Sequence, residues 1–246
     1  RKLVDAGNAE AQFKMGLILQ YGLGVEIDME AALNLQAAAA GAGHSMAQFA
    51  YGTLLFRGLR MPVDRKAARE WILKAANQGV HRAQEDVAGM FFEGIGGPVD
   101  QLTAAKWMQK AAEQGYDEAQ FSLGALHSEG LGVAKDAKKC TDWFSKAALQ
   151  GHRMAQTGLG KSYDEGKGVK ANPQKAYYWF TLAVRQGDEY ARKLRSEMIK
   201  QDKLKSSDLL AARRQAGNFK PKPSTVTKRS KLGITGAEHI TLISLM

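Results

Sequence analysis

Small and apolar residues recur along the chain in blocks that repeat every 36 residues. The pair Ala-Gln opens successive blocks at residues 11–12, 47–48, 83–84, 119–120 and 155–156. Within a block, apolar positions follow the spacing i, i+3, i+4, i+7, which places them on one face of an α-helix. Self-similarity at a fixed spacing of roughly 20 to 50 residues is typical of stacked-repeat proteins. The pattern therefore predicts paired helices that bury their apolar faces against one another.

Each block carries stop and start signals for two helices. The first helix, about residues 8–21 in the first block, closes on a glycine, which is the favoured left-handed stop. The closing glycines are Gly22, Gly58, Gly94, Gly130 and Gly166. A side chain that can cap the start of a second helix follows each time, at Asp28, Asp64, Asp100, Asp136 and Asn172. The chain is therefore predicted to consist of helix-turn-helix units.

The residues at fixed positions resemble a known family. The pattern Ala-Gln, Leu-Gly, Tyr-x-x-Gly-x-Gly-Val, Asp and Trp-Phe-x-Lys-Ala-Ala-x-Gln-Gly is similar to the Sel-1-like repeat, a relative of the tetratricopeptide repeat. Residues 155–187 keep nearly all of it, and the resemblance covers residues 1 to about 191. It implies an all-α fold, a right-handed α/α superhelical solenoid with a concave groove. It also implies an adaptor role and favours a bacterial envelope or extracytoplasmic setting, while the sequence itself leaves the compartment open.

The spacing also divides the chain into parts. We expect the end of a truncated upstream repeat at residues 1–7, followed by five repeats at 8–43, 44–79, 80–115, 116–151 and 152–187. Residues 188–219 are expected to form a C-terminal partial repeat and a capping helix, and residues 220–246 a basic, disordered tail. Because the start looks truncated, the absence of a signal peptide carries no weight.

Positive charge is concentrated at the C-terminal end. Residues 192–246 hold 13 Lys and Arg against 4 Asp and Glu, a balance of +9, which leaves +1 of the net +10 for residues 1–191. An inference from the basic pI therefore concerns this end only. Two interpretations stay open: the region 192–246 binds nucleic acid or an anionic membrane surface, or its lysines only aid solubility.

The sequence contains no recognisable catalytic or metal-binding set. The single cysteine, Cys140, occupies a position held by alanine in other blocks, which predicts a small core residue. Some cysteine-rich relatives have been described as β-lactamases, but the usual Ser-x-x-Lys and Lys-Thr-Gly motifs of that hydrolase chemistry do not occur here. Glycine loops such as residues 94–97 could bind phosphate, yet they lack a preceding strand and a Gly-Lys-Ser/Thr ending, so a turn is favoured. We predict a non-enzymatic protein with no cofactor, no metal and no small-molecule substrate.

The predicted binding site lies on the first helices. If they line the groove as in tetratricopeptide proteins, their variable inward-facing positions would contact a protein or peptide ligand. These positions are Phe13, Leu17, Gln20, Phe49, Thr53, Phe56, Glu85, Phe92, Phe121, Ser128, Lys161 and Asp164. Phe56 and Phe92 hold one position in adjacent repeats and could anchor a peptide, or they could instead cover neighbouring repeats. Phe13, Phe49 and Phe121 are weaker candidates, because an aromatic residue there is common in the family.

A ladder of carboxylates at Glu93, Glu129 and Glu165 precedes the closing glycines. It is either an acidic strip for a basic partner or a set of solvated helix ends. From these features we predict a scaffold or adaptor that binds a protein or peptide in its groove. The alternative is binding of nucleic acid or anionic lipid through the basic end, and a hydrolase is the least supported function.

Overall fold

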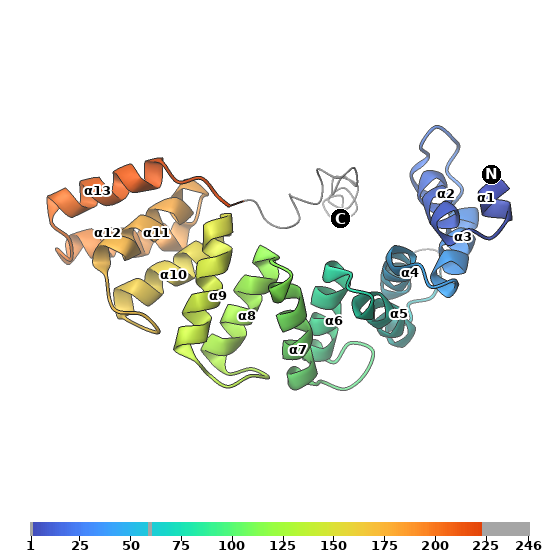
Figure 1. Cartoon of the computed structure of the whole chain (residues 1–246), viewed down its shortest axis with the longest axis horizontal. Helices are drawn as coiled ribbons and strands as arrows, with labels where there is room; N and C mark the ends of the chain where they lie inside the picture. Colours follow the sequence, from blue (N-terminus) through green and yellow to red (C-terminus); the bar gives the residue numbers. More distant parts are fainter. Residues whose placement is uncertain (1, 59–60, 223–246) are drawn as a thin grey trace. The chain divides into compact units, whose positions relative to one another are not determined.

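The computed structural model describes residues 2–58 and 61–222 of the 246-residue chain (Figure 1). These residues form helices and connecting turns, without a strand among them. The helices are α1 Lys2–Asp5, α2 Ala9–Tyr21, α3 Met29–Gly41, α4 Ser45–Arg57, α5 Arg65–Asn77, α6 His81–Glu93, α7 Gln101–Glu113, α8 Asp117–Glu129, α9 Ala137–Gln150, α10 Arg153–Glu165, α11 Pro173–Arg185, α12 Glu189–Lys200 and α13 Ser206–Gly217. The predicted all-α class is confirmed. Residues 223–246, most of the predicted basic tail, lie outside the described residues.

The predicted stop and start signals are present where the sequence placed them. Gly22 ends α2 with a φ of 63°, and the glycines that end α4, α6, α8 and α10 are also left-handed. Asp28 caps α3 by accepting a hydrogen bond of 2.9 Å from the backbone N–H of Ala31. Asn172 caps α11 in the same way, at 2.9 Å from the N–H of Lys175, and Pro173 follows it in the first helical turn. Local sequence therefore sets the length of each helix.

The chain forms two compact units, Arg1–Lys110 and Ala111–Met246. In unit 1, each helix from α1 to α5 packs against the next one along the chain. In unit 2, α8 packs on α9, α9 on α10 and α10 on α11, and α11 then contacts both α12 and α13 (Figure 1). We call α2, α4, α6, α8, α10 and α12 the first helices, and α3, α5, α7, α9 and α11 the second helices.

Small residues allow neighbouring helices to approach closely. Gly52 in α4 faces α5, and a Cβ atom at this position would lie 2.7 Å from Cγ1 of Ile72. Gly160 in α10 faces Phe180 of α11 in the same manner. The missing side chain at these mid-helix positions therefore permits tight helix crossing. The bulky side chains opposite them fill the space between helices, so the core is densely packed.

Glutamine side chains join consecutive repeats. In unit 1, Nε2 of Gln48 donates to the carbonyl of Ala40 at 3.2 Å, and Nε2 of Gln78 donates to Oε1 of Gln48 at 2.8 Å and to the carbonyl of Gly43 at 2.9 Å. We call this arrangement a glutamine bridge. It recurs in unit 2 as Gln120 with Gln150 and as Gln156 with Gln186. The bridge satisfies buried polar groups that would otherwise weaken the joint between repeats.

Histidine residues provide a second link between first helices. Nδ1 of His44 accepts the N–H of Ala47 at 3.1 Å and so caps α4, which leaves the ring proton on Nε2 to donate to Oε2 of Glu10 at 2.6 Å. Lys14 and His44 hold the pKa of Glu10 below its ordinary value. The same contacts join His152 of α10 to Glu118 of α8 at 3.0 Å. These histidines therefore have structural roles.

Candidate protein-binding surfaces

The aromatic pair predicted to anchor a ligand belongs to unit 1. Phe56 is the next-to-last residue of α4, and Phe92 is the next-to-last residue of α6. The Phe56 side chain is 38% exposed, although it is large and apolar, and Phe92 is half-buried. Both rings therefore have surface available to a partner at one end of the first helices.

Three other predicted residues of unit 1 pack within the repeats. The Phe13 ring lies 4.8 Å from the His44 ring, centroid to centroid. Oε1 of Gln20 accepts a hydrogen bond of 2.6 Å from Nε2 of Gln36. Phe49 is only 9% exposed and belongs to the core cluster. These side chains join neighbouring helices, and Phe49 in particular has little exposed surface for a ligand.

The remaining predicted residues of unit 1 are half-buried. Leu17 lies on α2, and the Thr53 hydroxyl donates to the carbonyl of Phe49 at 2.9 Å, within its own helix. Glu85 lies 3.8 Å from the guanidinium of Arg82, one turn earlier in α6. These side chains line the first helices but present less surface than Phe56.

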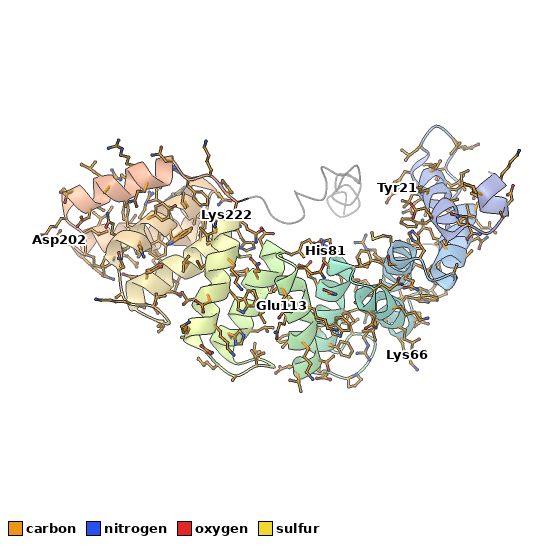
Figure 2. All side chains as sticks on the ribbon, viewed as in Figure 1. Tyr21, Lys66, His81, Glu113, Asp202 and Lys222 are labelled. Atoms are coloured by element: carbon orange, nitrogen blue, oxygen red, sulfur yellow. The ribbon has the colours of Figure 1, made fainter. Side chains whose placement is uncertain are left out.

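Sequence reasoning missed a row of polar residues across α2, α4 and α6. Tyr21, at the end of α2 (Figure 2), interacts electrostatically with Arg57 at the end of α4, and burial raises the tyrosine pKa. Arg57 also interacts with Asp86 of α6. Desolvation by the surrounding protein raises the pKa of Asp86, and the charges of Arg82 and Arg57 oppose this rise. Asp86 is nevertheless exposed to solvent. The change of residue type at this repeat position, from Lys14 to Asp86, was the signal available in the sequence.

In unit 2, the predicted residue Phe121 is a packing residue. Its ring lies 5.4 Å from the Phe144 ring and 4.8 Å from the His152 ring, in stacked arrangements. The hydroxyl of Ser128, another predicted residue, donates to Oε1 of Glu129 at 3.2 Å. Ser128 occupies the repeat position of Phe56 and Phe92. Unit 2 therefore has a small polar side chain where unit 1 has an aromatic ring.

The two remaining predicted residues connect α10 to the next first helix, α12. Lys161 places its ammonium 5.7 Å from the ring centroid of Tyr190, within the range of a cation–π contact. Asp164 forms an ion pair with Lys203, at 2.7 and 3.0 Å. The Thr157 hydroxyl donates to the Asp188 carboxylate at 2.8 Å. Lys161 therefore lies against the start of α12, whereas Asp164 is paired with a residue that follows the end of α12.

Two exposed residues of this surface were not selected from the sequence. Met154 is the second residue of α10 and Tyr190 the second residue of α12, and they are 44% and 53% exposed. They occupy the same repeat position, one repeat apart. The sequence signal was the variability of this position, which holds Glu10, Met46 and Arg82 in earlier repeats.

The glycine loop at residues 94–97 is occupied by protein. The guanidinium of Arg69 in α5 lies in the space that a side chain at Gly97 would fill, and it stands 4.7 Å from the ring centroid of Phe91. Gly96 lies against the carbonyl of Arg65. Because Gly96 and Gly97 have no side chains, α5 can pack against this loop. This agrees with the interpretation of the loop as a turn rather than as a phosphate-binding site.

The described residues provide little chemistry for catalysis. They contain no group of three or more His, Cys, Asp and Glu side chains that could hold a metal ion. Cys140 is buried, and burial raises the pKa of its thiol to about 11, so the nucleophilic thiolate is scarce at neutral pH. A hollow of about 460 Å³ in unit 2 is formed by Tyr163, Val169, Lys170, Ala171, Asn172 and Lys175. One lysine of this hollow, Lys175, lies over the Tyr163 ring at 5.1 Å.

Part of the basic C-terminal region is engaged within unit 2. Besides Lys203, Arg213 of α13 donates from Nε to the Tyr177 hydroxyl at 2.9 Å. The backbone N–H of Lys222, labelled in Figure 2, donates to the carbonyl of Leu149 at the end of α9, at 2.8 Å. Among the residues placed by the structure, no helix is long and apolar enough to cross a membrane.

Consecutive helical hairpins that pack on one another within each unit define an α-helical repeat protein. The sequence profile of the Sel1 repeat matches residues 9–44, 45–80, 81–116, 117–152 and 153–188. The chain belongs to the Sel1 repeat family. Proteins of this family typically serve as protein–protein interaction scaffolds, generally bind protein partners and are generally non-enzymatic.

Solved structures agree with this assignment. The chain is 30% identical to c5321 of uropathogenic Escherichia coli, a protective antigen with the same repeat fold, over 93% of this chain and 49% of that one, with a TM-score of 0.74. It is 28% identical to a Sel1 repeat protein of Oxalobacter formigenes, over 88% of this chain and 86% of that one, with a TM-score of 0.69. The chain therefore spans about half the length of c5321. No curated protein matches it. The predicted fold class, a solenoid of helix-turn-helix repeats, is confirmed.

Proposed function

We propose that this protein binds a peptide segment of a protein partner on the first helices of unit 1, with Phe56 and Phe92 as the anchors. The observation that carries the proposal is the exposure of Phe56, 38% for a large apolar side chain, at a repeat position that Phe92 also occupies in the adjacent first helix. Exposed aromatic residues next to polar groups are the usual energetic centres of protein interfaces.

The polar row beside the rings supports a recognition role. Tyr21, Arg57 and Asp86 lie on three successive first helices, and Arg57 interacts electrostatically with both Tyr21 and Asp86. Such a row can donate and accept hydrogen bonds to a peptide backbone or to its charged side chains. Anchors and polar groups together give both affinity and a preferred orientation of the ligand.

The proposal is tested with short random peptides displayed on phage and selected on the whole chain. Recovered peptides are resynthesised, and their dissociation constants are measured by fluorescence anisotropy for the wild type and for the Phe56→Ala/Phe92→Ala variant. We expect affinity to fall at least about tenfold, because buried aromatic anchors contribute the largest share of interface energy. Far-UV circular dichroism and thermal unfolding of the variant provide the control for folding.

Two outcomes would contradict the proposal. One is unchanged affinity of every recovered peptide in a variant that keeps its helical content. The other is loss of binding only when residues 220–246 are deleted, which would place the site on the basic end instead.

A further inference from the structure

Unit 2 exposes a second apolar surface, formed by the first turns of α10 and α12. Met154 and Tyr190 are each the second residue of their helix and are 44% and 53% exposed. They occupy equivalent positions of two successive first helices, so their exposure is repeated rather than scattered. The two parts of the chain are joined by the hydrogen bond from Thr157 of α10 to Asp188, which precedes α12, and by the contact of Lys161 with Tyr190.

The charges that face this surface are mainly positive. Lys161 lies 5.7 Å from the Tyr190 ring centroid, and Lys193 is three residues after Tyr190 and therefore on the same side of α12. Among the described residues, no carboxylate lies within 4.0 Å of either ammonium. The positive ends of the α10 and α12 helix dipoles also point to this region.

The nearby carboxylates are already held by donors. Asp188 accepts from the Thr157 hydroxyl and caps α12, and Asp164 is paired with Lys203. Glu189 forms an ion pair of 2.7 Å with Arg192. The surface around Met154 and Tyr190 thus has unpaired positive charge and compensated negative charge, which fits an anionic partner.

We propose that this surface binds an acidic peptide segment of a protein partner, with an apolar side chain of the segment placed between Met154 and Tyr190. Carboxylates of the segment then face Lys161 and Lys193. The site is separate from the Phe56 and Phe92 pair of unit 1 and does not depend on it. It also differs in specificity, because acidic residues flanking an apolar anchor are the feature that it selects.

The test uses the same library of phage-displayed random peptides, selected in parallel on the whole wild-type chain and on a Met154→Ser/Tyr190→Ser variant. Peptides recovered by the wild type alone are expected to carry several Asp or Glu residues around one large apolar residue. Their affinity should fall at least about tenfold in the serine variant, and several-fold in Lys161→Gln/Lys193→Gln. It should also weaken as salt is raised, because charge attraction is screened.

The Phe56→Ala/Phe92→Ala variant is the matched control, and it should bind these peptides as the wild type does. Because all four substituted side chains of the two unit 2 variants are on the surface, thermal unfolding should change little. Recovery of basic or uncharged peptides, or of acidic peptides that bind the serine variant equally well, would overturn the proposal. The same conclusion would follow if the peptides recovered by the wild type alone lost affinity in the Phe56→Ala/Phe92→Ala variant.

Discussion

The next-to-last residue is Phe56 in α4 and Phe92 in α6 of unit 1, but it is Ser128 in α8 and Asp164 in α10 of unit 2. At the second residue the difference is reversed for two helices of unit 2, because α10 holds the exposed Met154 and α12 the exposed Tyr190. Both units keep the glycine stops and the glutamine bridge. Buried positions therefore maintain the repeat, and exposed positions can change without disturbing it.

The comparison also separates apolar residues by burial. Phe180 of unit 2 is 1% exposed and packs against Gly160, whereas Phe56 of unit 1 is 38% exposed. A side chain stabilises the fold through the contacts that it makes, so phenylalanine contributes to the free energy of unfolding at residue 180 and leaves surface for a partner at residue 56. Burial, rather than aromatic character, distinguishes core residues from candidate anchors.

The largest expected effect comes from truncating these two rings. Phe180→Ala should lower the free energy of unfolding by about 3–5 kcal/mol, because it leaves a cavity in the packed core. Phe56→Ala should change it by no more than about 0.5 kcal/mol. Equilibrium urea unfolding followed by far-UV circular dichroism measures both. Equal losses for the two variants would contradict the distinction between core and surface.

The second effect concerns glycines at one loop position. Gly24 and Gly168 both have a φ near 75°, so alanine is strained in either place by about 1 kcal/mol. A Cβ at Gly168 would also overlap the carbonyl of Ala137, whereas one at Gly24 would meet no atom within 4 Å. Gly168→Ala should therefore cost about 2–4 kcal/mol and Gly24→Ala about 1 kcal/mol. Thermal unfolding of the two variants measures these costs. Similar losses of stability in both would show that close packing of the loop matters less than its backbone angle.

The smallest effect tests whether the two units share their internal framework. Gln48→Ala in unit 1 and Gln156→Ala in unit 2 each remove the centre of a glutamine bridge. The carbonyl of Ala40 or Ala148 loses its side-chain donor, and the amide of the partner glutamine loses one acceptor. Each should cost about 1–3 kcal/mol, and the two losses should be similar. Hydrogen exchange of the amides in the adjacent helix, read together with urea unfolding, would locate the loss. A marked loss in one unit only would show that the bridges are not equivalent.

Much of the fold could be predicted from local patterns. Gly22 and Asp28 act within a few residues of their own positions, so their meaning as a stop and a cap does not depend on distant parts of the chain. The Gly52 position was readable because a repeated glycine in a helix interior has a cost that only close packing offsets. The resemblance to the Sel-1-like repeat predicted how the two helices of each repeat pair.

The binding surfaces were harder to predict. Phe49 and Phe56 lie on the same helix, yet one is buried and the other is exposed, because the neighbouring helices cover only one of them. The contacts of Lys161 with Tyr190 and of Asp164 with Lys203 join residues far apart in sequence. Such partners follow from how repeats are placed, which the spacing alone does not specify.

The sequence by itself determined the helices, their ends and the repeated pairing, because these depend on short-range hydrogen bonds and on a regular apolar period. Only the tertiary structure decided which aromatic side chains face solvent and which charges remain unpaired. Those properties depend on the angles and contacts between neighbouring helices, and a side chain's exposure is set by everything that packs around it.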